Sequence, residues 1–173
     1  MDVFEAIYGR RSIRRFKSTP PPKESVEKIL DAGRHAPSAG NVQPWEFIVV
    51  WDDETREKLA SAALGQSFIA EAPVDIVVCV DLARARMAYG VRGETLYCIQ
   101  DTAAAIENML LAAYALGLGT CWVGAFSEEA VSRILNIPSG YRPVAIIPVG
   151  YPDEKPRPRP RRSLKEIVHL DRF

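Results

Sequence analysis

The sequence predicts a single domain, residues 1–173, in which helices flank a β-sheet, and so a protein of the α/β or α+β class. Short apolar runs typical of buried strands alternate along the chain with longer segments of helical period. The strand-like runs are few and one helix, over residues 94–116, is long and apolar, which favours a layered sheet over an eight-stranded barrel. A chain of 173 residues can bury a core without disulfides or metals.

Four shorter helices are expected from apolar spacing and from the residues that begin them. Residues 2–9 have Asp2 as a cap and carry four apolar side chains on one face. Residues 23–35 return to helical period after a proline-rich loop. Residues 52–64 have the acidic first turn that the helix dipole favours, and residues 127–135 begin at a capping serine.

The strongest helical signal in the chain covers residues 94–116. Apolar side chains recur there at spacings of three and four, and most positions between them are also small or apolar. Such a helix is buried nearly all round, either in a core or at a subunit interface, and Gly117 ends it as a C-cap. Residues 81–93, which precede it, are mixed in composition and are compatible with a mobile segment.

Four segments are predicted to be strands. Residues 47–51 and 74–80 are uninterrupted apolar runs typical of buried strands, and residues 121–126 are a third candidate. Residues 141–151 are a fourth, and because prolines interrupt this run we expect an edge or irregular strand. After an extended proline-rich segment, residues 164–168 are expected to form a short helical or strand-like stretch.

Composition and charge exclude several classes of function. Lys and Arg total 22, as do Asp and Glu, and this zero net charge argues against binding nucleic acid or an anionic membrane over the whole surface. No apolar run approaches the ~20 residues that span a bilayer, and no secretory leader is recognisable. We therefore expect a cytoplasmic protein with no nucleic-acid and no membrane partner. Cys79, Cys98 and Cys121 are far apart in apolar surroundings and are expected to be buried, reduced thiols.

Motifs of several enzyme classes are missing from the sequence. It has no Gly-x-Gly-x-x-Gly dinucleotide fingerprint and no P-loop. Residues 36–40 resemble a nucleophile elbow, but Ala36 replaces the first glycine and a helix precedes the motif, so we do not expect a serine hydrolase. His35 and His169 are the only histidines and belong to no carboxylate cluster, so we expect no metal site.

A basic cluster follows the first predicted helix. Arg10, Arg11, Arg14 and Arg15 lie within six residues together with Ser12. Guanidinium groups bind phosphate with two hydrogen bonds each, and the serine adds a hydroxyl donor. The spacing alone is equally compatible with a phosphate site and with a solvated basic face.

A second basic segment lies near the C-terminus, where cations alternate with prolines from Lys155 to Arg162. An extended chain projects alternate residues to one side, so that Arg157, Arg159 and Arg161 can align along a phosphate or another anion. The alternatives are a solvated tail and a basic arm that binds nucleic acid.

The loop 36–44 supplies the third set of polar groups. Ser38, Asn41 and Gln43 carry the short hydroxyl and amide groups that hydrogen-bond to a polar heterocycle or a ribityl chain. The alternative is that these residues only form an ordinary turn.

Taken in this order, these segments resemble the nitroreductase-like FMN-dependent oxidoreductases. The resemblance extends over essentially the whole chain. It rests on residues 10–16, residues 36–50, the apolar helix from about 100 to 116 with the segment 116–126 that follows it, and residues 148–168. It implies an α+β fold with a central, mostly antiparallel sheet flanked by helices, a long buried central helix, and a homodimer with FMN at the subunit interface.

The resemblance also assigns residues to FMN. Arg10, Arg11 and Ser12 take the phosphate and ribityl end, and Arg14 lies near the pyrimidine edge of the flavin, where a cation stabilises negative charge on N1 of the reduced ring. The partner subunit lays one loop against the flavin, and the residues of that loop are Pro37, Ser38, Ala39, Asn41 and Gln43. The remaining positions are Gln66, Gly124, Ala125, Arg159 and Arg161.

Two of these assignments carry further detail. Arg159 and Arg161 match C-terminal cations that contact the phosphate. Gly124 and Ala125 match the segment that passes the isoalloxazine ring, where many members have Glu-Gly, so this chain lacks a carboxylate at that contact.

The implied activity is ping-pong hydride transfer from NADH or NADPH through FMN to an electron-poor acceptor, namely a nitroaromatic, a quinone or an enone. The protein needs no acid or base of its own for the hydride steps, so no catalytic side chain is assigned. Residues 81–97 either shape the acceptor pocket or form surface helix and loop. Because the chain is short for the family, we expect an open active site.

Two other functions compete with this one. The first is a specialised member of the same fold that destroys flavin, dehalogenates or dehydrogenates. The second is a non-enzymatic module that binds an anion or nucleic acid through residues 156–162.

Overall fold

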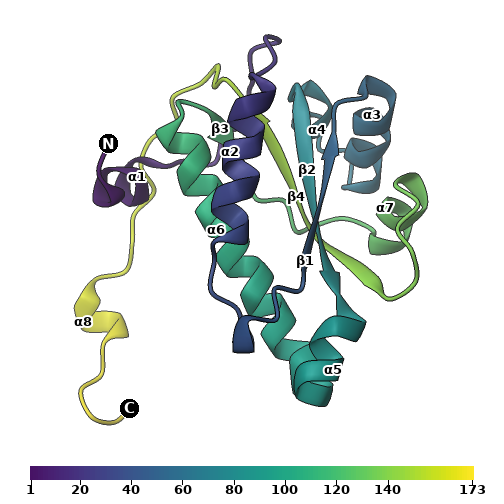
Figure 1. Ribbon diagram of the computed structural model, residues 1–173. Coiled ribbons are helices and arrows are strands. Elements are labelled where there is room, and N and C mark those ends of the chain that lie inside the picture. Colours follow the sequence, from purple (N-terminus) through teal and green to yellow (C-terminus); the bar gives the residue numbers. More distant parts are fainter.

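The computed structural model describes residues 1–173 and has a four-stranded sheet between two layers of helices (Figure 1). The strands are β1 (Trp45–Val50), β2 (Val74–Asp81), β3 (Gly119–Thr120) and β4 (Tyr141–Gly150). Their order is β1-β2-β4-β3 and every pairing is antiparallel, which confirms the predicted α+β class and antiparallel sheet.

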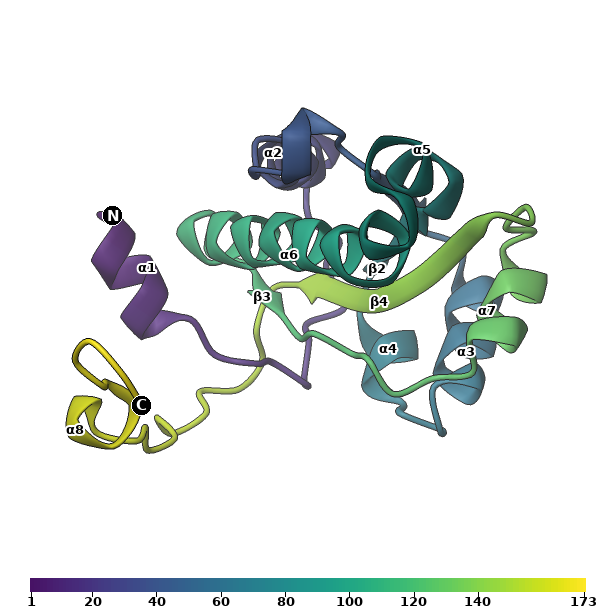
Figure 2. The ribbon, with the colours of Figure 1, turned by 90° about the horizontal axis from the view of Figure 1, so that it is seen from below.

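The helices fall into two groups, one on each face of the sheet (Figure 2). On one face lie α2 (Lys23–Arg34), α5 (Leu82–Arg92) and α6 (Cys98–Ala115). On the other lie α3 (Asp53–Ala62), α4 (Phe68–Glu71) and α7 (Glu128–Ile134). The short helices α1 (Val3–Gly9) and α8 (Leu164–Ile167) stand to one side of these layers, near the two chain ends.

Two hydrophobic cores fill the space between the sheet and its helices. Side chains of β2 alternate between them, because successive residues of a strand point to opposite faces. Ile76 and Val78 pack towards α2 and α6, whereas Val77 and Cys79 pack towards α3 and α7. Each of the fully buried aliphatic side chains contributes about 1.5–3 kcal/mol to folding.

The predicted edge position of residues 141–151 is wrong. β4 is an inner strand that pairs with β2 on one side and with β3 on the other. The predicted irregularity is present, because the register shifts at Val78/Cys79, where Pro143 faces Cys79. The sheet accommodates this proline at the shift, where the regular ladder is interrupted.

Residues 121–126 do not form the predicted strand. The regular pairing ends at Thr120, and only Val123 returns to the sheet, as an isolated bridge to Ile146. Burial still alternates, with Cys121 and Val123 buried and Trp122 exposed, so the apolar pattern is that of a strand that lacks a continuous partner.

The predicted helix over 94–116 is divided at its start. Residues Gly93–Tyr97 form a π-helical turn, and α6 begins at Cys98. Residues 81–93 form a regular helix for most of their length, interrupted at Tyr89 and Gly90. No residue from 101 to 114 is exposed, and half of these positions are fully buried. Thr95, Gln100, Ala115 and Leu116 are exposed, so the burial predicted for 94–116 holds only for the central part of the segment.

The predicted apolar face of the first helix remains uncovered within the chain. Val3, Phe4, Ile7 and Tyr8 are all exposed, and Ala6 is the only buried residue of α1. Beyond Glu154, the C-terminal segment also runs away from the body (Figures 1 and 2). The cysteines are free and buried, as predicted. None of the helices is both long enough and apolar enough to cross a membrane.

Candidate functional site

The two basic segments of the sequence meet in one pocket. A hollow of about 400 Å³ is formed where residues 10–14 face residues 154–161, and Pro156 is the only apolar side chain in its lining. Its lining residues are Arg10, Arg11, Ser12, Arg14, Glu154, Pro156, Arg157, Arg159 and Arg161. Six of the residues that the sequence predicted for a cofactor therefore lie around a single polar cavity.

Backbone hydrogen bonds bring these distant segments together. The amide of Ile13 donates to the carbonyl of Thr120 at 2.8 Å, which places the N-terminal cluster beside β3. Lys17 N donates to Tyr151 O and Asp153 N donates to Arg15 O, both at 2.9 Å. The cluster is therefore positioned by the edge of the sheet.

The pocket has a large excess of positive charge. Six of its residues are arginines and one, Glu154, is acidic. Arg10 is the only one of the six with a carboxylate within ion-pair distance, since its Nε lies 3.4 Å from Glu107 Oε1. An uncompensated group of guanidiniums of this kind is suited to bind a phosphate.

Arg11 is held more tightly than the other arginines. Its Nη1 atom donates to the carbonyl oxygens of Tyr8 and Arg10, each at 2.7 Å. These bonds fix the guanidinium at the C-terminal end of α1 and leave its other nitrogen atoms for a ligand.

Arg14 connects the pocket with a second group of predicted residues. Its guanidinium lies 5.8 Å from the centre of the Phe68 ring, which follows Gln66 by two residues. Gln66 Nε2 donates to Ala63 O at 2.9 Å and to Ala125 O at 3.3 Å. Gln66 and Ala125 are therefore in contact with each other. Through Phe68 and Arg14, this contact lies next to the basic pocket.

Gly124 leaves an open surface beside this group. A Cβ atom at this position would have no neighbouring atom within 4 Å. Three residues before Gly124 in the chain is the buried Cys121. Burial raises the pKa of its thiol, and the nearby Arg14 guanidinium and a hydrogen bond from Ser12 oppose that rise.

The loop 36–44 lies elsewhere in the chain. Ala39 N donates to Asp101 Oδ1 near the start of α6 at 3.0 Å, whereas Arg10 contacts Glu107 and Gly9 packs on Tyr114 near its end. The 18 residues of α6 span about 27 Å, and Figure 1 shows the loop and α1 near opposite ends of this helix. One chain therefore does not bring this loop to the basic pocket.

The loop is a compact turn with a defined conformation. Ser38 Oγ accepts a hydrogen bond from Gln43 N at 3.0 Å, and Gln43 Nε2 donates to Asn41 O at 3.2 Å. Gly40, Asn41 and Gln43 all have positive φ, and a side chain at Gly40 would collide with the Tyr89 hydroxyl. Pro37 and both amide residues are exposed, so a second molecule can reach them.

Residues 81–97 are associated with this loop and not with the basic pocket. Arg84 Nε donates to Val42 O at 2.6 Å, and Tyr89 packs edge-on against Tyr97 with ring centres 5.4 Å apart. Met87 is 85% exposed. The prediction that this segment shapes a pocket is not met within one chain, where it forms a surface helix and turn.

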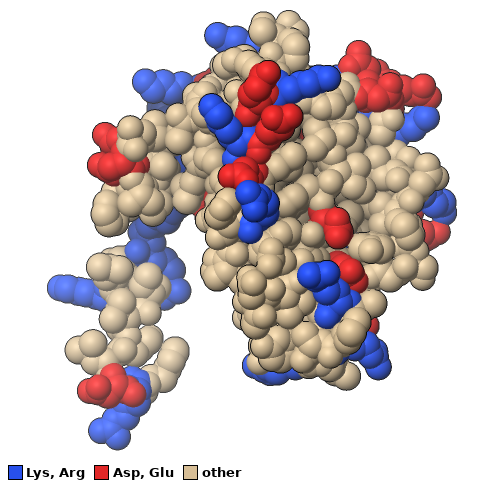
Figure 3. Space-filling view, in the orientation of Figure 1, with Lys and Arg blue, Asp and Glu red and all other residues tan.

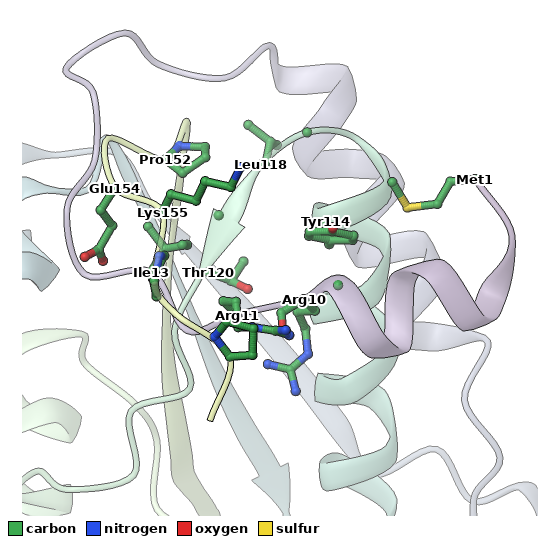
Figure 4. A pocket seen from close by; sticks show the side chains of 15 residues that line it. Met1, Arg10, Arg11, Ile13, Tyr114, Leu118, Thr120, Pro152, Glu154 and Lys155 are labelled. Carbon is green, nitrogen blue, oxygen red and sulfur yellow. The ribbon is translucent and has the colours of Figure 1, made fainter. Parts of the chain in front are cut away.

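A second pocket of about 490 Å³ shares Arg10, Arg11, Glu154 and Pro156 with the first (Figure 4). Tyr114 of α6 and Leu118 form part of its wall. Figure 3 shows Lys and Arg side chains along the C-terminal segment that leads away from these pockets. Neither Glu154 nor Tyr114 was predicted from the sequence as a site residue. Glu154 lies within residues 148–168, one of the segments on which the resemblance rests. A single carboxylate among many charged residues does not by itself indicate a site.

Comparisons with known proteins identify the family of the chain. The family model described as "Nitroreductase family" matches residues 7–68 and 60–151. A "Putative NADH dehydrogenase/NAD(P)H nitroreductase" of Methanothermobacter thermautotrophicus is 39% identical, over 100% of this chain and 88% of its own length.

Solved structures show the same similarity. Nitroreductase A of Vibrio parahaemolyticus superposes with a TM-score of 0.92 at 30% identity, covering 100% of this chain and 77% of that one. The NADPH:FMN oxidoreductase of Vibrio harveyi, complexed with NAD⁺, gives 0.91 at 29% identity, covering 99% and 77%.

Proposed function

This chain belongs to the nitroreductase family, and we propose that it is an FMN-dependent oxidoreductase that uses NADH or NADPH to reduce an electron-poor acceptor. The acceptor classes are nitroaromatics, quinones and enones. The observation that carries the proposal is the polar pocket in which six arginines face one carboxylate.

The pocket fits the phosphate of FMN. Arg10, Arg11 and Ser12 approach it from the N-terminal side, and Arg159 and Arg161 approach it from the C-terminal side. A phosphate monoester carries close to two negative charges at neutral pH and accepts several charge-assisted hydrogen bonds, which this donor set can supply. The same placement disfavours the alternative of a nucleic-acid arm, because Arg157, Arg159 and Arg161 face a cavity.

The ring side of the site follows from the position of Arg14. Its contact with Phe68 directs it towards the segment that carries Gln66, Gly124 and Ala125. FMN, when bound, supplies the hydride chemistry between nicotinamide and acceptor. Arg14 would hold positive charge near the pyrimidine edge of the bound ring, and the open surface at Gly124 would leave room for flat acceptors of different shapes.

We further propose that two copies of the chain complete each site. The loop 36–44 cannot reach the basic pocket of its own chain, but its exposed Asn41 and Gln43 are free to contact a flavin held by another copy. The uncovered apolar residues of α1, with Leu164 and Ile167 of α8, offer the surface for such a homodimer.

The test is spectroscopic. The purified protein, loaded with FMN where necessary, is mixed with NADH or NADPH without oxygen, and then with menadione or nitrofurazone. We expect bleaching of the flavin absorption by a nicotinamide and its return with the acceptor. A colourless protein that cannot be loaded with FMN, or a flavin that neither nucleotide reduces, contradicts the proposal.

A further inference from the structure

Glu154 has an unusual position among the residues of the basic pocket. It is the only acidic residue that lines the pocket, yet it forms no ion pair with any of the six arginines. Its Oε1 atom instead accepts hydrogen bonds from the backbone amides of Arg14 at 2.5 Å and Arg15 at 3.2 Å. Two successive amides directed at one anion form a recognised type of anion-binding concavity, and here a side chain of the protein occupies it.

The contact lies where the two ends of the site are joined. Backbone bonds link residues 15–17 with residues 151–153, and Glu154 extends this link by one residue. Beyond it, no residue from 155 to 173 makes a hydrogen bond to any part of the chain outside that segment. Glu154 is thus the last fixed point before Arg157, Arg159 and Arg161.

We propose that Glu154 is a positioning residue of the phosphate pocket. It fixes the backbone that carries Arg14. It also fixes the start of the segment that carries the C-terminal arginines, so that these lie opposite Arg10 and Ser12. Because its carboxylate is engaged by amides, the guanidiniums remain available for the ligand. This inference rests on the proposed FMN function.

Two simpler roles give different expectations for the same residue. If Glu154 only lowers the positive potential of the pocket, its removal strengthens binding of a phosphate monoester, because a like charge is lost. If Glu154 only supports folding, its removal lowers thermal stability and raises the dissociation constants of FMN and riboflavin by the same factor.

The experiment compares Glu154→Ala with Glu154→Gln in the full-length apoprotein. The dissociation constants of FMN and riboflavin are measured by flavin fluorescence, since the ratio of the two constants isolates the contribution of the phosphate. The matched control is Asp153→Asn, which removes the neighbouring carboxylate, half exposed and 3.6 Å from Arg15, outside the pocket. A second readout is the two-electron midpoint potential of the FMN-loaded proteins, which responds to the position of Arg14.

We expect Glu154→Ala to raise the dissociation constant of FMN about tenfold or more and to reduce the preference for FMN over riboflavin. We also expect this variant to lower the midpoint potential of the bound flavin. Glu154→Gln keeps an acceptor oxygen and should restore FMN affinity to within about threefold of wild type. Tighter FMN binding in both variants, or an unchanged preference and potential in Glu154→Ala, overturns this inference while wild type still binds FMN. Failure of the wild type itself to bind FMN overturns the proposed function as well.

Discussion

Arg10 and Glu107 form the ion pair that anchors the basic pocket to the long central helix. The Nε atom of Arg10 lies 3.4 Å from Glu107 Oε1, and no hydrogen bond within the chain engages either of its terminal nitrogens. The side chain of Arg10 is 23% exposed, so its orientation is set by the pair while its outer face is open to a ligand. This geometry leaves the terminal nitrogens of Arg10 available to a phosphate.

The first prediction concerns that donor. Arg10→Ala removes a charge-assisted hydrogen bond, which is worth about 1.5–3 kcal/mol, so the dissociation constant of FMN should rise tenfold or more. Riboflavin, which has no phosphate, should bind with nearly unchanged affinity. Arg15→Ala is the control, because Arg15 belongs to the same cluster but does not line the pocket and is 69% exposed. Equal losses for FMN and riboflavin would place Arg10 outside the phosphate site.

A second prediction separates Arg14 from the other arginines. Arg14→Ala should lower the affinity for FMN. It should also make reduction of the bound flavin less favourable, because positive charge near N1 is lost. Spectroelectrochemical titration of the FMN-loaded protein measures the midpoint potential directly. Arg10→Ala again offers a comparison, since it should change affinity with little effect on the potential. An unchanged potential in Arg14→Ala contradicts the assigned role.

Local patterns predicted the elements that depend on local contacts. The helix α6 follows from apolar spacing, because its burial against the sheet and α2 requires apolar side chains at three- and four-residue intervals. The position of β4 could not be predicted in the same way. Its prolines indicated an edge strand, but which strands flank it is decided by the whole sheet, and the register shift opposite Pro143 accommodates one of them.

Long-range features of the site were accessible only through the family resemblance. Charge spacing alone left residues 10–15 evenly divided between a phosphate site and a solvated face, because it gives no information on what lies opposite. Contacts between segments some 140 residues apart in the chain place Arg159 and Arg161 opposite this cluster. The resemblance assigned Arg15 no role, and the structure places it outside the pocket, paired with Asp153.

A third prediction tests whether two copies share one site. The loop variant Asn41→Gly/Gln43→Gly removes two amides at positions whose φ values are +57° and +54°, a conformation that glycine adopts readily. The second variant is Arg10→Ala. Homodimers of either variant have no intact site, but a mixed dimer has one site with a wild-type pocket from one copy and a wild-type loop from the other.

Mixed dimers are obtained by co-expression with two affinity tags. We expect them to bind about one FMN per dimer with wild-type affinity and to recover about half of the wild-type activity. The control is a mixed dimer in which one copy carries both sets of substitutions and the other is wild type, which leaves two sites that are each half defective. Recovery in this control alone would show that pocket and loop of the same chain act together.

The last prediction concerns Asp75, an ionisable residue in the core that faces α3. Asp75 is fully buried on β2, neither of its oxygens has a hydrogen-bond partner, and burial raises its pKa well above the usual value, with Arg56 opposing the rise. The folded state therefore retains a proton that the unfolded state loses above about pH 4. The contribution of this group to stability is complete below the unfolded pKa and is lost as pH rises through the folded pKa.

Asp75→Asn removes this titration. The unfolding free energy of the wild type should therefore fall relative to that of Asp75→Asn as pH rises above 4, by at most about 1.4 kcal/mol per pH unit. Urea unfolding of the apoproteins at one protein concentration, from pH 4.5 to 7.5, measures the difference. Asp52→Asn is the control, because hydrogen bonds from Thr55 lower the pKa of Asp52, so its contribution is lost only as pH falls below about 4 and should stay constant over this range. A difference between wild type and Asp75→Asn that does not change with pH would mean that Asp75 is ionised in the folded core, with Arg56 as its counter-ion.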